Sequence, residues 1–534
     1  MLTAPDGGNI EIRTMSKKTR TRIKRLRPYA AGVLALALLG GCAVGPDYQR
    51  PAVDVGTGYK ESQGWIRAVP SDAALRGDWW KLYEDPELNR LMDELLASNL
   101  SIAQAEAQYR QAQALVQSAR SAFFPTVGVD ASMSRSGSGS GSSNSSGSNF
   151  SGNGNGASNQ YTLTGSVSWE PDLWGKVRRD VESNRAGEQA SAADLANTRL
   201  SMQSTLAQSY FQLRALDAEK RLYEQTVAAY ERSLKTTQNR LAVGMVSQSD
   251  VAAARTQLEN AKVQQLALNW QRAQLEHALA VLVGKTPSAF TLTPEKTTVT
   301  VPDIPVAVPS VLIQRRPDVA AAERRTAEAN AKIGVAQAAW FPDLTLSAQG
   351  GYRSGQWAQW LTAPFNFWSL GPSLALTLFD GGARQAQVDQ ARAAYDAQVA
   401  AYRLTVLTAM REVEDYLVQV HVLGQEQQAQ NRALEAARES LRLTLNQYNA
   451  GMIDYLSVVQ VEATALSAER SALSMNADRL VASVQLIAAL GGGWQAGGEA
   501  VREARSASET AAADGVNGAD GQAQAPIVEP AAKP

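Results

Sequence analysis

Apolar and polar residues alternate at period two in four short segments of the chain: 127–134, 161–169, 344–352 and 368–378. This alternation predicts β-strands with one apolar and one polar face. Each segment has about 8–11 residues, the length of a tilted strand that crosses a bilayer. Aromatic residues gather at the segment ends, as in an interfacial girdle: Phe123, Phe124, Trp169, Trp340, Phe341, Phe367 and Trp368. We therefore expect transmembrane strands. A soluble β-sandwich is the alternative, and the separation into two distant hairpins disfavours it.

Four strands are too few to close a barrel. An open sheet edge cannot lie in lipid, because its N–H and C=O groups find no partner there. Membrane barrels need about eight strands or more. We therefore expect oligomers, in which two copies supply eight strands and three copies twelve. The Ser- and Thr-rich strand faces would then line the lumen.

Two long stretches of the chain contain no proline. Sixty-eight residues separate Gly175 from Gly244, and sixty-eight separate Gly382 from Gly451. Each stretch could form a helix roughly 100 Å long at 1.5 Å per residue. Apolar residues recur at about the 3.5-residue spacing of coiled coils. Glycine suits the C-terminal cap of a helix, so we expect helical hairpins with tips at 240–250 and 448–456.

The two halves of the sequence repeat each other. Gly244 and Gly451, like Gly284 and Gly491, lie 207 residues apart. Such a fixed spacing predicts an internal duplication. The expected organisation is a signal peptide at 1–41, an N-terminal segment at 42–87, a first repeat at 88–285 with a β-hairpin at 124–170, a linker at 286–314, a second repeat at 315–494 with a β-hairpin at 342–380, and a disordered tail at 495–534.

The N-terminus has the pattern of a secretory signal. Seven Lys and Arg residues lie between Ser16 and Arg27, and an apolar run from Tyr29 to Leu39 follows. The run is shorter than the roughly 20 residues that a spanning helix needs. Cys42, the one cysteine, stands at the cleavage point and resembles the acylated cysteine of a bacterial lipobox. A free cysteine after an ordinary signal is the alternative.

Composition narrows the classes of function. The chain has 51 Lys and Arg against 52 Asp and Glu, with two His and one Cys. These counts argue against disulfide frameworks, zinc fingers and most Cys- or His-centred catalysis. Balanced charge argues against a nucleic-acid partner. We expect no enzyme activity, no metal and no cofactor other than a covalent lipid on Cys42.

Several motifs, in this order, resemble one family. They are Cys42 to Tyr48, Trp79-Trp80, Asp85 to Leu88, Arg315 to Asp318, Phe341-Pro342, Leu378 to Gly382 and Leu490 to Trp494. The sequence resembles the TolC/OprM-type outer-membrane factors, in particular the NodT-like efflux lipoproteins. The resemblance implies a trimeric duct in which a twelve-stranded outer-membrane β-barrel continues into a long periplasmic α-helical barrel. An equatorial domain would begin within 42–87 and include the linker.

The resemblance also implies a function. Such a duct is the exit channel of a tripartite efflux pump for antibiotics, drugs and other toxic small molecules. It is anchored in the outer membrane of a Gram-negative bacterium and works with a periplasmic adaptor protein. An inner-membrane transporter, commonly of the resistance-nodulation-division (RND) class, completes the pump. The duct of a type I protein secretion system and a lipid-anchored coiled-coil scaffold remain as alternatives.

The family resemblance places functional residues at the helical tips. Residues that match the adaptor-docking turns are Arg240, Val243, Gly244, Met245, Ser247, Tyr448, Ala450, Gly451 and Met452. Residues that match the periplasmic gate are Asp454, Leu456, Ser457 and Gln460. Relatives often carry Asp at the position of Gln460 and some carry a second Asp at Ser457, so a negative ring would have to come from Asp454 instead.

Overall fold

The computed structural model describes residues 43–54, 58–61, 78–137, 157–294, 300–302 and 316–492. The predicted signal peptide, Cys42 and the C-terminal tail lie outside these ranges. Two compact units divide the chain, and each draws on both predicted repeats. One comprises Met1–Gln49, Ala114–Arg185 and Ala327–Asp396, and the other comprises Arg50–Gln113, Ala186–Thr326 and Ala397–Pro534.

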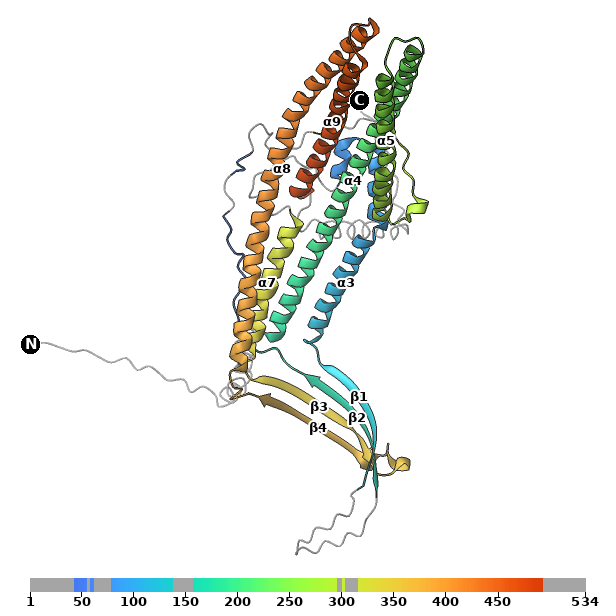
Figure 1. The fold of residues 1–534 in the computed structure, drawn as a ribbon. Helices are drawn as coiled ribbons and strands as arrows, with labels where there is room; N and C mark the ends of the chain where they lie inside the picture. Colours follow the sequence, from blue (N-terminus) through green and yellow to red (C-terminus); the bar gives the residue numbers. More distant parts are fainter. Residues whose placement is uncertain are drawn as a thin grey trace, which may run out of the picture. The chain divides into compact units, whose positions relative to one another are not determined.

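The first unit contains one antiparallel sheet in the order β1-β2-β3-β4 (Figure 1). Its strands are β1 (Thr126–Ser136), β2 (Ser158–Trp169), β3 (Asp343–Ser354) and β4 (Asn366–Ala375). The four predicted strands are confirmed, with shifts of up to three residues at their ends. Pairing of β1 with β2 continues to Ser136 and Ser158, and β4 ends before Leu376. Backbone N–H and C=O groups form the hydrogen bonds between strands. Polar residues can therefore extend a strand beyond the segment in which apolar and polar side chains alternate.

Strand register sorts side chains onto two faces of the sheet. Directly paired residues share a face, because side chains alternate along each strand. One row across the sheet is apolar, and the adjacent row is small or polar. The apolar row consists of Val127, Val167, Ala348 and Leu370. The small or polar row consists of Gly128, Ser166, Gln349 and Ser369. In the described sheet, β1 and β4 each have a neighbour on one side and leave the other edge open.

Two pairs of helices repeat each other in length and spacing. The long helices α4 (Lys176–Ala242) and α8 (Ala383–Asn449) have 67 residues each. The return helices α5 (Gln248–Leu282) and α9 (Tyr455–Ala489) have 35 residues each. Both pairs are offset by 207 residues, so the helical duplication predicted from the glycines is confirmed. No described helix is long and apolar enough to span a membrane.

Shorter elements complete the two units. They are the 3-10 turns η2 (Trp79–Tyr83), η3 (Pro287–Ala289), η4 (Trp357–Gln359) and η5 (Ala363–Phe365), and the helices α2 (Pro86–Ser98), α3 (Leu100–Ser121) and α7 (Pro317–Ala338). Proline opens both α2 and α7, where its missing N–H costs nothing.

The core of the second unit forms around η2, α2 and α4. Trp79, Trp80 and Tyr83 are buried against Tyr210 and Phe211. Leucines of α2 and residues near the ends of α5, α8 and α9 extend the same cluster. This core places aromatic side chains from the N-terminal segment against both repeats. It therefore fixes the part of the helices from which the two tips extend.

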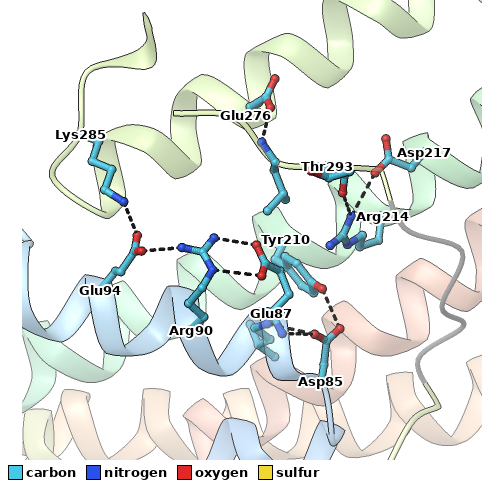
Figure 2. Close-up of polar contacts among 12 residues, drawn as sticks. Asp85, Glu87, Arg90, Glu94, Tyr210, Arg214, Asp217, Glu276, Lys285 and Thr293 are labelled. Carbon is cyan, nitrogen blue, oxygen red and sulfur yellow. Dashed lines mark hydrogen bonds and ion pairs between the residues drawn. The ribbon is translucent and has the colours of Figure 1, made fainter. Parts of the chain in front are cut away.

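A polar network surrounds this core (Figure 2). Asp85 caps α2 by accepting hydrogen bonds from the backbone N–H groups of Glu87 and Leu88, and its Oδ2 accepts one from the Tyr210 hydroxyl at 2.7 Å. On the surface, Arg90 joins two glutamates of α2, one of which, Glu94, also pairs with Lys285 at 2.8 Å. The network holds α2 to α4 and to the segment that follows α5.

Candidate functional site: the paired helical tips and one face of α9

The first tip, between α4 and α5, is closed by local hydrogen bonds. Gly244 has φ of +74°, and its N–H donates to the Leu241 carbonyl at 2.8 Å. Met245 N–H donates to the Arg240 carbonyl at 2.9 Å. This is the left-handed C-cap for which glycine is the preferred residue. Ser247 then caps α5 in a reciprocal capping box with Asp250.

The second tip, between α8 and α9, repeats this turn. Gly451 has φ of +75°, and Met452 N–H donates to the Gln447 carbonyl at 2.9 Å. Asp454 caps α9 and accepts hydrogen bonds from both the backbone N–H and the hydroxyl of Ser457. These bonds lower the pKa of the exposed Asp454 carboxyl. Asp454 and Ser457 thus bond to each other at the start of α9.

Contacts between side chains join the two tips. The Arg240 guanidinium lies 4.5 Å from the centre of the Tyr448 ring. The Tyr448 ring in turn lies 5.6 Å from that of Tyr455, and the Tyr455 hydroxyl is 3.0 Å from that of Ser233. The structure therefore brings together Arg240 and Tyr448, which the sequence had placed on separate tips. Sequence reasoning missed Ser233 and Tyr455.

Large apolar side chains project from the ends of both tips. Val243 and Met245 are exposed on the first, and Met452 is exposed on the second. Gly244 and Gly451 have open space around them, since an added Cβ would meet no atom within 4 Å. Each tip therefore presents exposed apolar side chains at its turn.

One face of α9 lines a cavity of about 790 Å³. Predicted gate residues Leu456 and Gln460 both belong to its wall, whereas Asp454 does not. No ionisable side chain is among its ten lining residues: Gln257, Gln430, Leu456, Val459, Gln460, Ala463, Thr464, Ser467, Ala468 and Ser471. Leu456 is 63% exposed, so it makes little contribution to the core. The cavity wall is therefore uncharged, with amide, hydroxyl and small apolar groups.

Comparison with known proteins identifies the class. A family profile described as "Outer membrane efflux protein" matches residues 91–285 and 308–492. The chain therefore belongs to the outer membrane efflux protein family. Its relatives and its fold make it an outer-membrane exit channel of an efflux pump in a Gram-negative bacterium. The efflux relatives favour this function over protein secretion and over a scaffold.

Two curated relatives are similar along most of their length. The toluene efflux pump outer membrane protein TtgC of Pseudomonas putida is 31% identical over 462 residues, which cover 86% of this chain and 94% of the relative. The outer membrane protein OprJ of Pseudomonas aeruginosa is 30% identical over 477 residues, which cover 88% and 98%.

Solved structures agree with the fold. The outer-membrane channel OprN superposes with a TM-score of 0.76 at 29% identity, over 85% of this chain and 100% of that chain. The open state of the Neisseria gonorrhoeae MtrE outer membrane channel superposes with a TM-score of 0.73 at 28% identity, over 85% and 99%. The predicted TolC-like fold is confirmed by these neighbours.

Proposed function

We propose that three copies of this chain form the channel and that it serves an RND-type tripartite pump. The open edges of β1 and β4 support assembly of several copies, and the likeness to outer-membrane channels of efflux pumps supports three copies and a pump. In lipid each edge must pair, and β4 of one copy against β1 of the next satisfies both. Three copies give twelve strands, whose apolar row faces lipid and whose polar row faces the lumen.

Both helical tips are the proposed docking sites for a periplasmic adaptor. The duplicated turns at Gly244 and Gly451 present Val243, Met245 and Met452 to solvent in the same way. Arg240, Ser247, Tyr448 and Ala450 would flank or support the docked partner. A covalent lipid on Cys42 would anchor the N-terminus in the outer membrane, as the lipobox pattern predicts.

Leu456 and Gln460 are the proposed constriction. They share the uncharged wall of the α9 cavity, so three copies around an axis would form an apolar ring beside an amide ring. This wall suits neutral and amphiphilic cargo such as solvents and apolar drugs. The names of the relatives, which include a toluene pump and an antibiotic pump, support this cargo class.

Bilayer conductance of the purified protein, with cross-linking to count subunits, tests the channel. We expect a trimeric pore that is closed most of the time; a monomer without conductance would overturn the proposal. Leu456→Ala should then increase uptake of a large antibiotic by cells, because it removes most of the apolar ring. Leu456→Met, of similar volume, is the matched control. Equal uptake by both variants at normal trimer levels would refute the constriction.

A further inference from the structure

One partly buried carboxylate of α9, that of Glu462, has no role in the site described above. Glu462 lies one helical turn after Val458 and one turn before Leu466, so the three share a face of the helix. Val458 is 1% exposed in a cluster with Tyr448, Tyr455 and Ala254. Leu466 packs against a second cluster, which includes Tyr223, Tyr230 and Leu258. Glu462 therefore stands between two apolar clusters that join α9 to α4 and α5.

One oxygen of this carboxylate lacks the hydrogen-bond partner that a buried polar atom normally has. Its Oε2 is sealed from solvent and accepts no hydrogen bond from any residue that the structure describes. Burial alone raises the pKa of Glu462 to about 7. Burial, with a smaller contribution from the Glu462 charge, also raises the pKa of Tyr230, on the facing side of α4. An uncompensated buried carboxylate is costly when ionised and tolerable when protonated.

The Tyr448 hydroxyl is also buried without a hydrogen-bond partner among the described residues. Most other ionisable groups along this stretch are engaged or exposed. Tyr455, on α9 itself, is the second phenol that senses the Glu462 charge, and it bonds to Ser233. The cations Lys262 of α5 and Arg470 of α9 pair with glutamates of α4 and α5, and Arg438 of α8 pairs with Glu469. Of the remaining charged residues of α4 and α5 near these clusters, Lys220 and Arg221 are half-buried, whereas the others are exposed: Glu224, Arg232, Lys235 and Arg255.

We propose that Glu462 is a proton-responsive residue of the gate helix: its neutral form holds α9 packed against α4 and α5, and its ionised form loosens that packing. The inference rests on the proposed role of α9 as the constriction helix. Leu456 and Gln460 lie on the cavity face of the same helix. Loosening the buried face would therefore shift the wall of the passage.

The direction of the pH effect follows from the two states. A loosened Glu462 would be solvated and titrate near 4.5, its ordinary value, whereas the packed one titrates near 7. Below pH 4.5 both states are protonated and the packed state suffers no penalty. Between pH 4.5 and about pH 7 only the packed state keeps the proton on Glu462, so the packed state loses stability relative to the loosened state as the pH rises. The ratio of packed to loosened protomers should fall up to about tenfold from about pH 6 to about pH 8.

Open probability in planar bilayers at pH 6 and pH 8 tests the proposal. The wild-type channel should open up to about tenfold more often at pH 8 than at pH 6. Glu462→Gln, which is nearly isosteric and cannot ionise, should stay mostly closed at both values. Glu435→Gln, which removes an exposed carboxylate of α8, is the matched control and should keep the wild-type response. A full pH response in Glu462→Gln would overturn the proposal.

Hydrogen exchange gives a second measurement, which does not depend on channel conductance. After correction for intrinsic pH effects, amides of α9 from 458 to 470 should exchange faster at pH 8 than at pH 6 in the wild type and equally at both in Glu462→Gln. Equal protection at both pH values in the wild type would refute the switch. Absence of any conducting trimer would instead refute the proposed channel assembly, which keeps the two failures distinct.

Discussion

Asp217 of α4 is the side chain whose loss should damage the helical unit most. Its carboxylate is fully buried and pairs with Arg272 of α5 at 2.7 Å and with Arg214 at 3.5 Å. Both arginines are themselves nearly buried, with 13% and 10% of their side chains exposed. Figure 2 shows Arg214 between Asp217 and the Thr293 carbonyl. Asp217 therefore compensates two guanidinium groups that hold α4, α5 and the following segment together.

The free energy of unfolding that Asp217→Ala should lose depends on the interactions that Arg272 keeps in the variant. Breaking a buried ion pair by removing one partner costs about 3–5 kcal/mol, because the other charge stays buried. Arg272 keeps an ion pair with Glu276 at 2.9 Å and a bond to the Leu292 carbonyl. This places the loss near the lower end of the range, at about 3 kcal/mol. Asp217→Asn should lose less, since the amide oxygen still accepts a hydrogen bond from Arg272.

Thermal unfolding of the purified protein, followed by helical circular dichroism, measures the loss. We expect Asp217→Ala to lower the midpoint by about 3 °C, because a chain of 534 residues has a large unfolding entropy. Arg442→Ala serves as the control, because it removes an ion pair with Glu439 in which both partners are exposed. Exposed pairs of this kind contribute little, so its midpoint should match the wild type. The reasoning is wrong if Asp217→Ala unfolds at the wild-type temperature, or if the two variants lose stability equally.

Three further variants, one of them a control, probe the sheet and the core. Gly351→Ala should block trimer assembly, because its Cβ would lie 1.8 Å from the Leu163 carbonyl oxygen in the neighbouring strand, whereas Gly371→Ala, whose Cβ would meet nothing within 4 Å, should assemble normally. Semi-native gels measure the trimer yield of both glycine variants, and equal yields would contradict the register in which β3 pairs with β2. Tyr210→Phe should cost about 1.5–3 kcal/mol by removing a hydrogen bond to the charged Asp85, and an unchanged unfolding midpoint would show that this bond contributes nothing.

Sequence alone predicts the helices because their signals are local. Absence of proline permits a long helix, and glycine at Gly244 and Gly451 ends it where the chain must adopt positive φ. Both long helices end within two residues of these glycines. The strands were also found, because period-two alternation is a local signal. The predicted ends of the strands were less accurate. The pairing of Arg135 with Asn159 is made by backbone groups, and the alternation of side chains does not reveal it.

Contacts between distant helices left no signal in the sequence. Nothing in the local pattern around Glu462 distinguishes this partly buried carboxylate from the many exposed glutamates of these helices. Its surroundings depend on the packing of α9 on α4 and α5, which brings Leu466 against Tyr230 and Leu258, about 200 residues or more away in the chain. The partnership of Arg240 with Tyr448 was likewise visible only once the two tips were placed together.

The duplication also shows how the two hairpins have diverged. At the fixed offset of 207, Tyr448 corresponds to Leu241 and Glu462 to Arg255, which is exposed on α5. The capping pair is reversed as well, with Ser247 and Asp250 on the first tip and Asp454 and Ser457 on the second. A carboxylate next to a helix N-terminus is favoured in either order, so both caps preserve the turn. The aromatic pair and the partly buried carboxylate occur only in the second copy. The first hairpin therefore supplies the surface against which α9 packs, and the second carries the residues that can change that packing.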